Sequence, residues 1–283
     1  MFIKTVKSAG FCFGVKRAVK IAVASFENHK DKAIYTLGQI IHNNDVVNKL
    51  KEKGIIPIED EKKVSDIKNS VVILRSHGVK KNILEKLKEN NNTIVDAICP
   101  FVKKIHNHVE MLTSERYFVV IIGDKNHPEV AAISSFADKE NSIVVSRFDE
   151  IKQIGKKEKI GVVVQTTQEL ENFLKITEEL LKNKGEIRIF NSICNATSRR
   201  QKESVETAKD VNVMIVVGGK HSANTKRLYE ICKNINPSTY HIENAMEIEY
   251  DWFKNKNSVG ITAGASTPDY VIEEVVRTIR DCQ

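Results

Sequence analysis

The stretch VDAICPFVKKIH, residues 95–106, is the segment from which the fold can be worked out. The apolar run at 93–98 indicates a buried strand, and Pro100 suits the first position of a helix. Cys99 therefore stands at a strand-to-helix corner, where the N–H groups that open the helix would stabilise a thiolate. A thiol at such a corner can be a buried structural residue, a nucleophile or a metal ligand.

The chain has 283 residues, enough for two or three domains, and its hydrophobic content of 41% is ordinary for a globular protein. No segment approaches the roughly 18 uninterrupted apolar residues of a membrane span. The opening MFIKTVKSAGFCFGV has no apolar core followed by a small-residue cleavage site, so we expect no secretion. We predict a cytoplasmic protein with no membrane segment.

The formal net charge of +7 suits an anionic substrate, an acidic protein partner or nucleic acid. The lysines are scattered, and the chain has no zinc-finger spacing, RNA-binding signature or interleaved basic and aromatic stripe. We therefore expect no nucleic-acid partner. The five cysteines are an odd number in a chain without a signal peptide. In a reducing compartment, such cysteines more often bind metal or catalyse reactions than form disulfides.

Short β-branched runs alternate with helical segments along the whole chain, which indicates an α/β fold. The predicted strands include residues 71–74, 93–98, 117–122, 142–145, 159–164, 186–189, 213–217 and 258–262. The predicted helices include residues 80–89, 168–182, 225–234 and 270–281.

Three cysteines occupy the same place in this alternation, after an apolar run and before a helix: Cys12 in AGFCFGVKRAV, Cys99 in DAICPFVKKIH and Cys194 in NSICNATSRRQ. They are 87 and 95 residues apart. About thirty residues after each cysteine comes a polar loop that opens a helix: LGQIIHNNDVVNKL, IGDKNHPEVAAI and VGGKHSANTKRLYEI. A third polar corner follows: LRSHGVKKNIL, VVQTTQELENFL and TAGASTPDYVIEEV. One plan therefore occurs three times.

We interpret this pattern as three similar α/β units, or repeats, at residues 1–97, 98–192 and 193–283. In an open α/β sheet, ligands gather outside the carboxyl ends of the strands. All nine corners lie at such ends. If the repeats are arranged around a pseudo-threefold axis, the corners converge on one cavity.

Three cysteines from three repeats favour a shared metal site over a single nucleophile. Such a site could hold zinc or an iron–sulfur cluster. Ligands so far apart do not show the C-x₂-C spacing of structural zinc sites. A [4Fe–4S] cluster normally takes four thiolates, and with three, one iron keeps an open position for substrate. Cys232 lies within a predicted helix and is expected in the core, and Cys282 is expected to have no role.

Polar residues on the remaining corners describe a phosphate cradle. A histidine just ahead of a helix can donate to an anion that the helix N-terminus attracts, although a structural histidine is the alternative. The glycines at 218, 219 and 264 would allow close backbone approach. The chain has no Walker loop and no G-x-G-x-x-G motif, so ATP and NAD are not indicated. The residues of the predicted cradle are His42, His77, His127, Thr166, Ser222, Asn224 and Ser266.

Glu129, two residues after His127, is the best acid–base candidate, with a surface carboxylate in the first helical turn as the alternative. Thr166 and Thr167 could relay a proton to it. His106 and His108 are two apart on a predicted helix and cannot form an i,i+4 metal pair, so we expect both at the surface. The same expectation holds for His29, His221 and His241.

The motifs GFCFGVKRA, GQIIHN, SHGV, DAICPFVKK, HPEV, QTT, ICNATSRRQ, GGKHSANT and TAGAST follow one another from residue 10 to residue 267. In these residues the chain closely resembles the LytB/IspH family of 4-hydroxy-3-methylbut-2-enyl diphosphate reductases. The resemblance implies a monomeric, three-domain fold with pseudo-threefold symmetry around a central [4Fe–4S] cluster with one open iron site. The implied ligands of that cluster are Cys12, Cys99 and Cys194.

The resemblance also implies roles for the other corner residues. His42, His77, Ser222, Asn224 and Ser266 would grip the substrate diphosphate. Catalysis at the reacting hydroxyl end would fall to His127, Thr166 and Glu129, with Glu129 as proton donor. Ala223 departs from the family, which often has serine there, and its backbone N–H at the helix start could still bind substrate.

The implied reaction is a two-electron, two-proton reductive loss of the allylic hydroxyl, giving isopentenyl and dimethylallyl diphosphates. A ferredoxin or flavodoxin, both typically acidic, would dock on the basic surface as electron donor. Two other functions stay open. One is a non-redox [4Fe–4S] hydro-lyase, and the other is a zinc-stabilised module that binds anions.

Overall fold

The structure, a computed structural model, describes residues 1–41, 43–183 and 185–281. In this part of the chain the strands form three four-stranded sheets in which every pairing is parallel. Parallel sheets need helices on their faces, and this explains why their strands are continuous apolar runs. All four residues of β4 (Val71–Leu74) and all five of β10 (Val213–Val217) are buried.

The sheet of the first repeat has the strand order β3-β2-β4-β5. Its further strands are β2 (Ile34–Leu37), β3 (Ile55–Ile58) and β5 (Thr93–Asp96). The helices of this part of the chain are α1 (Phe13–Asn28), α2 (Asn44–Glu52) and α3 (Lys81–Glu89).

The sheet of the second repeat has the order β7-β6-β8-β9, the same order as the first when the strands are counted along the chain. Its strands are β6 (Phe118–Ile122), β7 (Ser142–Val145), β8 (Lys159–Val164) and β9 (Glu186–Phe190). Its helices are α4 (Pro100–Ser114), α5 (Pro128–Ser134) and α6 (Leu170–Leu180).

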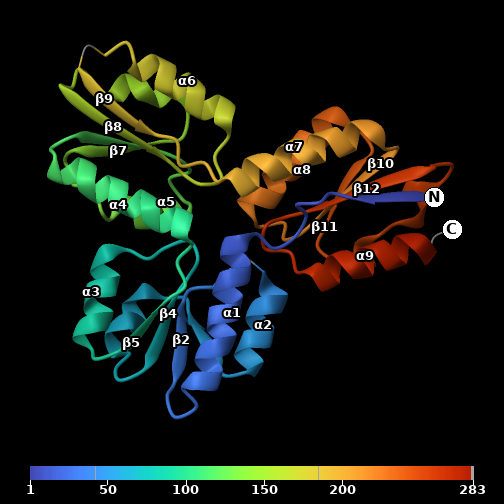
Figure 1. Cartoon of the computed structure of the whole chain (residues 1–283), viewed down its shortest axis with the longest axis horizontal. Coiled ribbons are helices and arrows are strands. Elements are labelled where there is room, and N and C mark those ends of the chain that lie inside the picture. Colours follow the sequence, from blue (N-terminus) through green and yellow to red (C-terminus); the bar gives the residue numbers. More distant parts are fainter. Residues whose placement is uncertain (42, 184, 282–283) are drawn as a thin grey trace. The chain divides into compact units, whose positions relative to one another are not determined.

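The third sheet repeats the order with one substitution: its fourth strand is β1 (Phe2–Thr5), from the start of the chain. The register runs from Phe2 opposite Ser258 to Thr5 opposite Ile261, and Figure 1 shows this blue strand beside β12. The other strands are β10, β11 (Thr239–Ile242) and β12 (Ser258–Ala263), and the helices are α7 (Asn195–Asp210), α8 (Ala223–Ile235) and α9 (Asp269–Asp281).

The α/β prediction and the three similar repeats are confirmed. The division at residues 97/98 and 192/193 and the threefold arrangement around a cluster stay predictions. The prediction placed residues 2–5 in the first repeat, whereas β1 pairs with β12 in the third sheet.

The chain forms two compact units. Unit 1 comprises Met1–Lys16, Ile41–Lys49 and Asn195–Gln283, and unit 2 comprises Arg17–Ile40 and Leu50–Cys194. Unit 1 holds the β1-β12-β10-β11 sheet with an apolar cluster on either face, one built around Val275 and Ile261 and the other around Leu228 and Met214. The other two sheets and their cores belong to unit 2. No helix among the described residues combines the length and apolar character that a membrane crossing requires.

Candidate active site

Each of the three repeated cysteines immediately precedes a helix, as the sequence predicts. Cys12 lies ahead of α1, Cys99 ahead of α4 and Cys194 ahead of α7. Cys99 is the N-cap of α4, with Pro100 behind it, and its side chain makes no capping hydrogen bond. All three are reduced thiols that are partly exposed. Partly exposed thiols at helix starts have the donor chemistry that an iron–sulfur cluster requires.

The backbone N–H of each cysteine donates to the third polar corner of its own sheet. Each acceptor carbonyl stands two residues after the end of a strand (β12, β4 and β8, respectively), so the three corners are equivalent residue by residue. The bonds are Cys12 N to Ala265 O at 3.1 Å, Cys99 N to Ser76 O at 3.0 Å and Cys194 N to Thr166 O at 2.8 Å. The cysteine corner and the small polar corner, which the sequence links only by spacing, are thus joined in all three sheets.

Cys12 belongs to unit 1, whereas Cys99 and Cys194 belong to unit 2. Within residues 1–41, 43–183 and 185–281, no group of three His, Cys, Asp or Glu side chains forms a ready metal site. The metal site of three thiolates predicted from the sequence stays a prediction.

Glu129 lies in the first turn of α5 and is 1% exposed. Thr166 donates twice to its carboxyl group, from N to Oε1 at 2.7 Å and from Oγ1 to Oε2 at 2.8 Å. Burial raises the pKa of Glu129 to about 7, and the two hydrogen bonds from Thr166 oppose that rise. The group is therefore a buried carboxyl that can hold a proton near neutral pH, rather than a surface carboxylate.

Thr166 connects the carboxyl group to a cysteine corner. Its N–H and hydroxyl bind Glu129, while its carbonyl accepts the N–H of Cys194. Thr167 does not share this role, because its Oγ1 accepts a hydrogen bond from Gln165 Nε2 at 3.0 Å. Of the two threonines considered for a proton relay, Thr166 is the one that contacts Glu129.

His127 is the N-cap of α5, and its Nδ1 accepts the N–H of Glu129 at 3.1 Å. The neutral ring therefore carries its proton on Nε2. The ring of His77 stands edge-on to that of His127, with centroids 5.8 Å apart. His77 follows Ser76, whose carbonyl holds Cys99. Unit 2 thus brings together His77, His127, Glu129, Thr166 and the corners of two cysteines.

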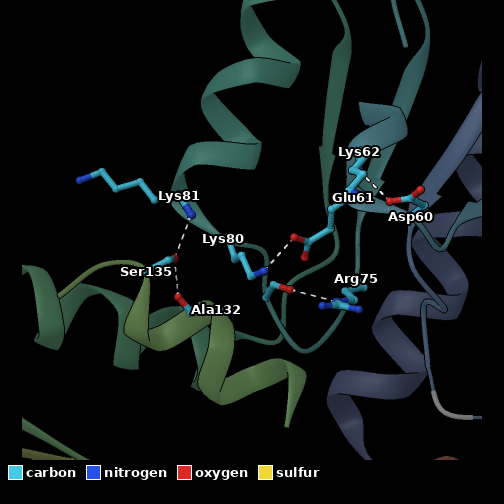
Figure 2. Close-up of polar contacts among 9 residues, drawn as sticks. Asp60, Glu61, Lys62, Arg75, Lys80, Lys81, Ala132 and Ser135 are labelled. Atoms are coloured by element: carbon cyan, nitrogen blue, oxygen red, sulfur yellow. Dashed lines mark hydrogen bonds and ion pairs between the residues drawn. The ribbon is translucent and has the colours of Figure 1, made fainter. Parts of the chain in front are cut away.

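The loop that carries His77 is fixed on both sides. Arg75 Nε donates to Gly78 O at 3.2 Å, and Gly78 has a φ of +88°, which suits glycine. Figure 2 shows the next two contacts: Lys80 Nζ lies 2.7 Å from Glu61 Oε2, and Lys81 N donates to Ser135 Oγ at 2.9 Å. Ser135 is the C-cap of α5, so the loop of His77 is tied to the helix that carries Glu129.

His106 corrects an expectation from the sequence, because it is buried rather than at the surface. It is 4% exposed and stacks on Phe136 with a centroid distance of 4.3 Å. A Cβ added to Gly78 would lie 2.7 Å from its Cε1, so the ring packs directly under the loop of His77. Burial lowers the pKa of His106 to about 4. Its neighbour His108 is half-buried and stacks on Phe190 at 4.0 Å.

Unit 1 carries the other predicted cradle residues. Ser222 is the N-cap of α8, and its Oγ accepts Thr225 N at 3.3 Å. Ala223 is the first residue of that helix. Asn224 Nδ2 is buried and has no hydrogen-bond partner among the described residues, a condition that a bound acceptor would relieve. Ser266 follows Ala265, the carbonyl partner of Cys12.

Glycines allow this part of unit 1 to close tightly. Gly218 has a φ of +140°, and a Cβ there would lie 2.6 Å from Thr267 Oγ1. A Cβ on Gly264 would lie 2.2 Å from Thr225 Oγ1. Side chains of this chain therefore fill the space beside Gly218 and Gly264, and the close approach of their backbone to a phosphate stays a prediction. His42 lies outside the residues that the structure describes, and its role stays a prediction.

Comparison with known proteins agrees with the resemblance. The sequence model described as LytB protein matches residues 3–280. A relative from Trichlorobacter lovleyi named 4-hydroxy-3-methylbut-2-enyl diphosphate reductase is 47% identical over 279 residues, covering 99% of this chain and 98% of the relative.

Two solved structures are also similar over nearly the whole chain. One, described as (E)-4-hydroxy-3-methyl-but-2-enyl diphosphate reductase, the terminal enzyme of the non-mevalonate pathway, is 44% identical with a TM-score of 0.76, covering 99% of this chain and 100% of that one. The other, the E-1-hydroxy-2-methyl-but-2-enyl-4-diphosphate reductase from Plasmodium falciparum, is 29% identical with a TM-score of 0.89, covering 98% of this chain and 87% of that one. The chain therefore belongs to the LytB protein family.

Proposed function

We propose that this chain is a 4-hydroxy-3-methylbut-2-enyl diphosphate reductase. The reaction takes up two electrons and two protons, breaks the allylic C–O bond and releases water together with isopentenyl or dimethylallyl diphosphate. The observation that carries the proposal is the buried Glu129, bonded twice by Thr166, whose carbonyl in turn holds Cys194. A proton source next to a cysteine corner suits a reductive loss of hydroxide.

Cys12, Cys99 and Cys194 would hold a [4Fe–4S] cluster. Such a cluster, when bound, supplies single electrons and an open iron position that polarises the substrate hydroxyl. The predicted ligands fit the group, because all three are reduced, partly exposed and at helix starts.

Glu129 would donate the proton that converts the leaving hydroxide into water. Hydroxide is a poor leaving group, and a carboxyl with a pKa of about 7 carries a proton at neutral pH and can release it. After the transfer, the N–H and hydroxyl of Thr166 stabilise the carboxylate. His127, oriented by its bond to the backbone of Glu129, presents its ring next to that of His77 and would bind the hydroxyl end of the substrate.

The diphosphate would be held by helix-start and hydroxyl donors. The start of α8 offers backbone N–H groups and a positive dipole end to an anion. Asn224 Nδ2 is a buried donor that lacks an acceptor among the described residues. Binding energy from this end of the substrate would fix the reacting allyl unit. The residues proposed for the diphosphate are His42, His77, Ser222, Ala223 (through its backbone), Asn224 and Ser266.

A ferredoxin or flavodoxin would supply the electrons, attracted by the net charge of +7. We place the reaction in the cytoplasm and expect a monomer of three domains, at 1–97, 98–192 and 193–283.

The test is anaerobic reconstitution with iron and sulfide, followed by assay with a chemical one-electron reductant and product analysis by mass spectrometry. We expect a brown protein and reductant-dependent formation of both diphosphate products. Cys194→Ser should lose the cluster, whereas the matched control Cys232→Ala should keep it, because Cys232 is buried in α8. Turnover without reductant would favour a hydro-lyase, and zinc without sulfide would favour an anion-binding module.

A further inference from the structure

Two arginines in the cysteine motifs have no part in the proposed reaction. Arg17 lies in GFCFGVKRA, five residues after Cys12, and Arg200 lies in ICNATSRRQ, six residues after Cys194. Each donates to the backbone that leads into a different cysteine.

Arg17 holds the corner of Cys99, within unit 2. Its Nη1 donates to Ile98 O at 3.0 Å, and its Nη2 donates to Asp96 O at 3.1 Å. Ile98 is the residue directly before Cys99. The Asp96 carboxylate closes the same corner, because Oδ1 accepts Ile98 N at 3.0 Å and Oδ2 lies 2.6 Å from Lys103 Nζ. The carbonyl groups of Asp96 and Ile98, just before Cys99, therefore both accept hydrogen bonds from Arg17.

Arg200 holds the corner of Cys12, within unit 1. Its Nε donates to Ser8 O at 2.7 Å, and its Nη2 donates to Gly10 O at 2.8 Å. The side chain is 3% exposed, so it is a buried cation, and two of its partners are these backbone carbonyls. Gly10 has a φ of +86° and lies two residues before Cys12. Ser8 is fixed again through its N–H, which donates to Glu203 Oε2 at 3.0 Å.

The third cysteine helix makes the corresponding contact without an arginine. On α4, which follows Cys99, the ring of His108 stacks on Phe190 at 4.0 Å, four residues before Cys194. Each helix that follows one of the three cysteines thus contacts the segment before another of them. Helix α1 contacts the segment before Cys99, α7 contacts the segment before Cys12, and α4 contacts the segment before Cys194. Two of these contacts are paired hydrogen bonds from a guanidinium, and the third is an aromatic stack.

We propose that Arg17 and Arg200 are positioning residues for the cluster ligands Cys99 and Cys12, respectively, each acting from a helix that begins at another ligand. The proposal rests on the function proposed above. A guanidinium has five donors in a rigid fork, so one side chain can hold two carbonyls at a fixed separation, which the ammonium of lysine does less well. A metal site needs its ligands held to within about 0.5 Å, and a loop reaches that accuracy only when its backbone groups are fixed.

The test compares Arg17→Ala, Arg17→Lys, Arg200→Ala and Arg200→Lys with the wild-type full-length chain. The controls are Lys20→Ala and Lys202→Ala, exposed lysines on the same two helices. Hydrogen–deuterium exchange is measured by mass spectrometry under anaerobic conditions, before and after reconstitution. The reporter amides are those of Ile98 and Cys99 for one corner, and those of Ser8 and Cys12 for the other.

We expect a crossed pattern. Arg17→Ala should speed exchange at the corner of Cys99 about tenfold or more and leave the corner of Cys12 close to wild type, and Arg200→Ala should do the reverse. The lysine variants should recover only part of the protection, because they restore the charge without the fork. After reconstitution, each alanine variant should release iron to a chelator faster than its control and show an altered electron paramagnetic resonance spectrum of the reduced cluster.

Exchange that speeds up only around the mutated residue, or equally at all three corners, would overturn the proposal. Wild-type protection of the reporter amides in the lysine variants would overturn the role of the forked guanidinium group. If Arg200→Ala does not fold, exchange at the amides of Ser8 and Cys12 in Arg200→Lys decides whether Arg200 positions Cys12. Wild-type protein that takes up no iron and sulfide would refute the proposed cofactor, while the exchange pattern before reconstitution would still decide the role of the arginines.

Discussion

Replacing Glu129 by glutamine should stabilise the protein above neutral pH while stopping turnover. The carboxamide can keep both contacts with Thr166, because its oxygen accepts the backbone N–H and its NH₂ group donates to the hydroxyl, which rotates to accept. The substitution therefore removes the titration of a buried group and keeps a partner for the Thr166 N–H and the Thr166 hydroxyl oxygen.

The sign and size of the effect follow from the pKa. The native state holds the pKa of Glu129 at about 7, against an ordinary value of 4.5, because burial disfavours the charged form. As the pH rises from 4.5 to about 7, the unfolded chain ionises and the native protein does not, so the wild type loses stability across this window. At about 1.4 kcal/mol per pKa unit, the full loss is about 3 kcal/mol. The glutamine variant cannot ionise and has no such loss.

The assay is urea denaturation of the chain before reconstitution with iron and sulfide, from about pH 5 to about pH 8, for wild type and Glu129→Gln. Other titrating groups are common to both proteins and cancel in the difference. Far-UV circular dichroism should report the transition, because the single tryptophan, Trp252, lies in unit 1 whereas Glu129 lies in unit 2. The free-energy difference should rise with pH in favour of the variant and level off above about pH 7.

A difference that stays flat over this range would refute the reasoning that burial keeps Glu129 protonated. For the reconstituted enzyme, kcat should fall by about 10²- to 10⁴-fold, the usual contribution of a positioned acid. Near-normal turnover would remove Glu129 from the role of proton donor, whatever the stability result.

Three further changes test separate parts of the site. Thr166→Val removes the hydroxyl bond that lowers the pKa of Glu129, so the alkaline limb of the kcat/KM profile should move to higher pH; an unchanged limb would argue against this coupling. Asn224→Ala should raise the KM for substrate about tenfold and leave the melting temperature within error of wild type, because Nδ2 has no partner among the described residues. His106→Phe keeps the stack on an aromatic ring but cannot protonate. Since the pKa of His106 is lowered from 6.5 to about 4, wild-type stability should fall as the pH drops through this window, and thermal denaturation at acid pH should show a smaller loss in the variant.

The predicted strands that match the structure best are the long β-branched runs. The strands at 71–74, 142–145, 159–164 and 213–217 have the predicted bounds. Those at 71–74 and 213–217 are apolar and buried throughout, as expected of strands covered by helices on both faces. Four strands were not predicted: β1, β2, β3 and β11, each of four residues. β3 contains Pro57, which weakens a strand pattern. The pairing of β1 with β12 cannot be read from a local pattern, because the two strands lie at opposite ends of the chain.

The site divides in the same way. The threefold spacing of Cys12, Cys99 and Cys194 is a long-range pattern written in the sequence, and it located the corners correctly. The burial of Glu129 cannot be predicted from the local sequence, because it depends on Thr166, which lies 37 residues later and bonds the carboxyl group. Local position alone favours a surface carboxylate.

His106 is a different case, because the sequence does contain the signal for its burial. It lies at the same face of α4 as the buried residues Val102, Ile105 and Val109, at the spacing of one helical stripe. The two-residue spacing of His106 and His108, which excludes an i,i+4 metal pair, says nothing about whether either ring is buried. A helical stripe that includes a histidine indicates a packed ring, here one under the loop of His77.

The bonds that hold the three cysteine corners also set an order of events during synthesis. The corners of Cys99 and Cys194 close onto residues 23 and 28 positions earlier, which are already synthesised when these cysteines are added. Cys12 must wait for Ala265, 253 residues later. At about 5–20 residues per second, that delay is roughly 13 to 50 s. The first cysteine to be made is therefore the last to reach its native corner, and cluster insertion that needs all three thiols must follow synthesis of nearly the whole chain.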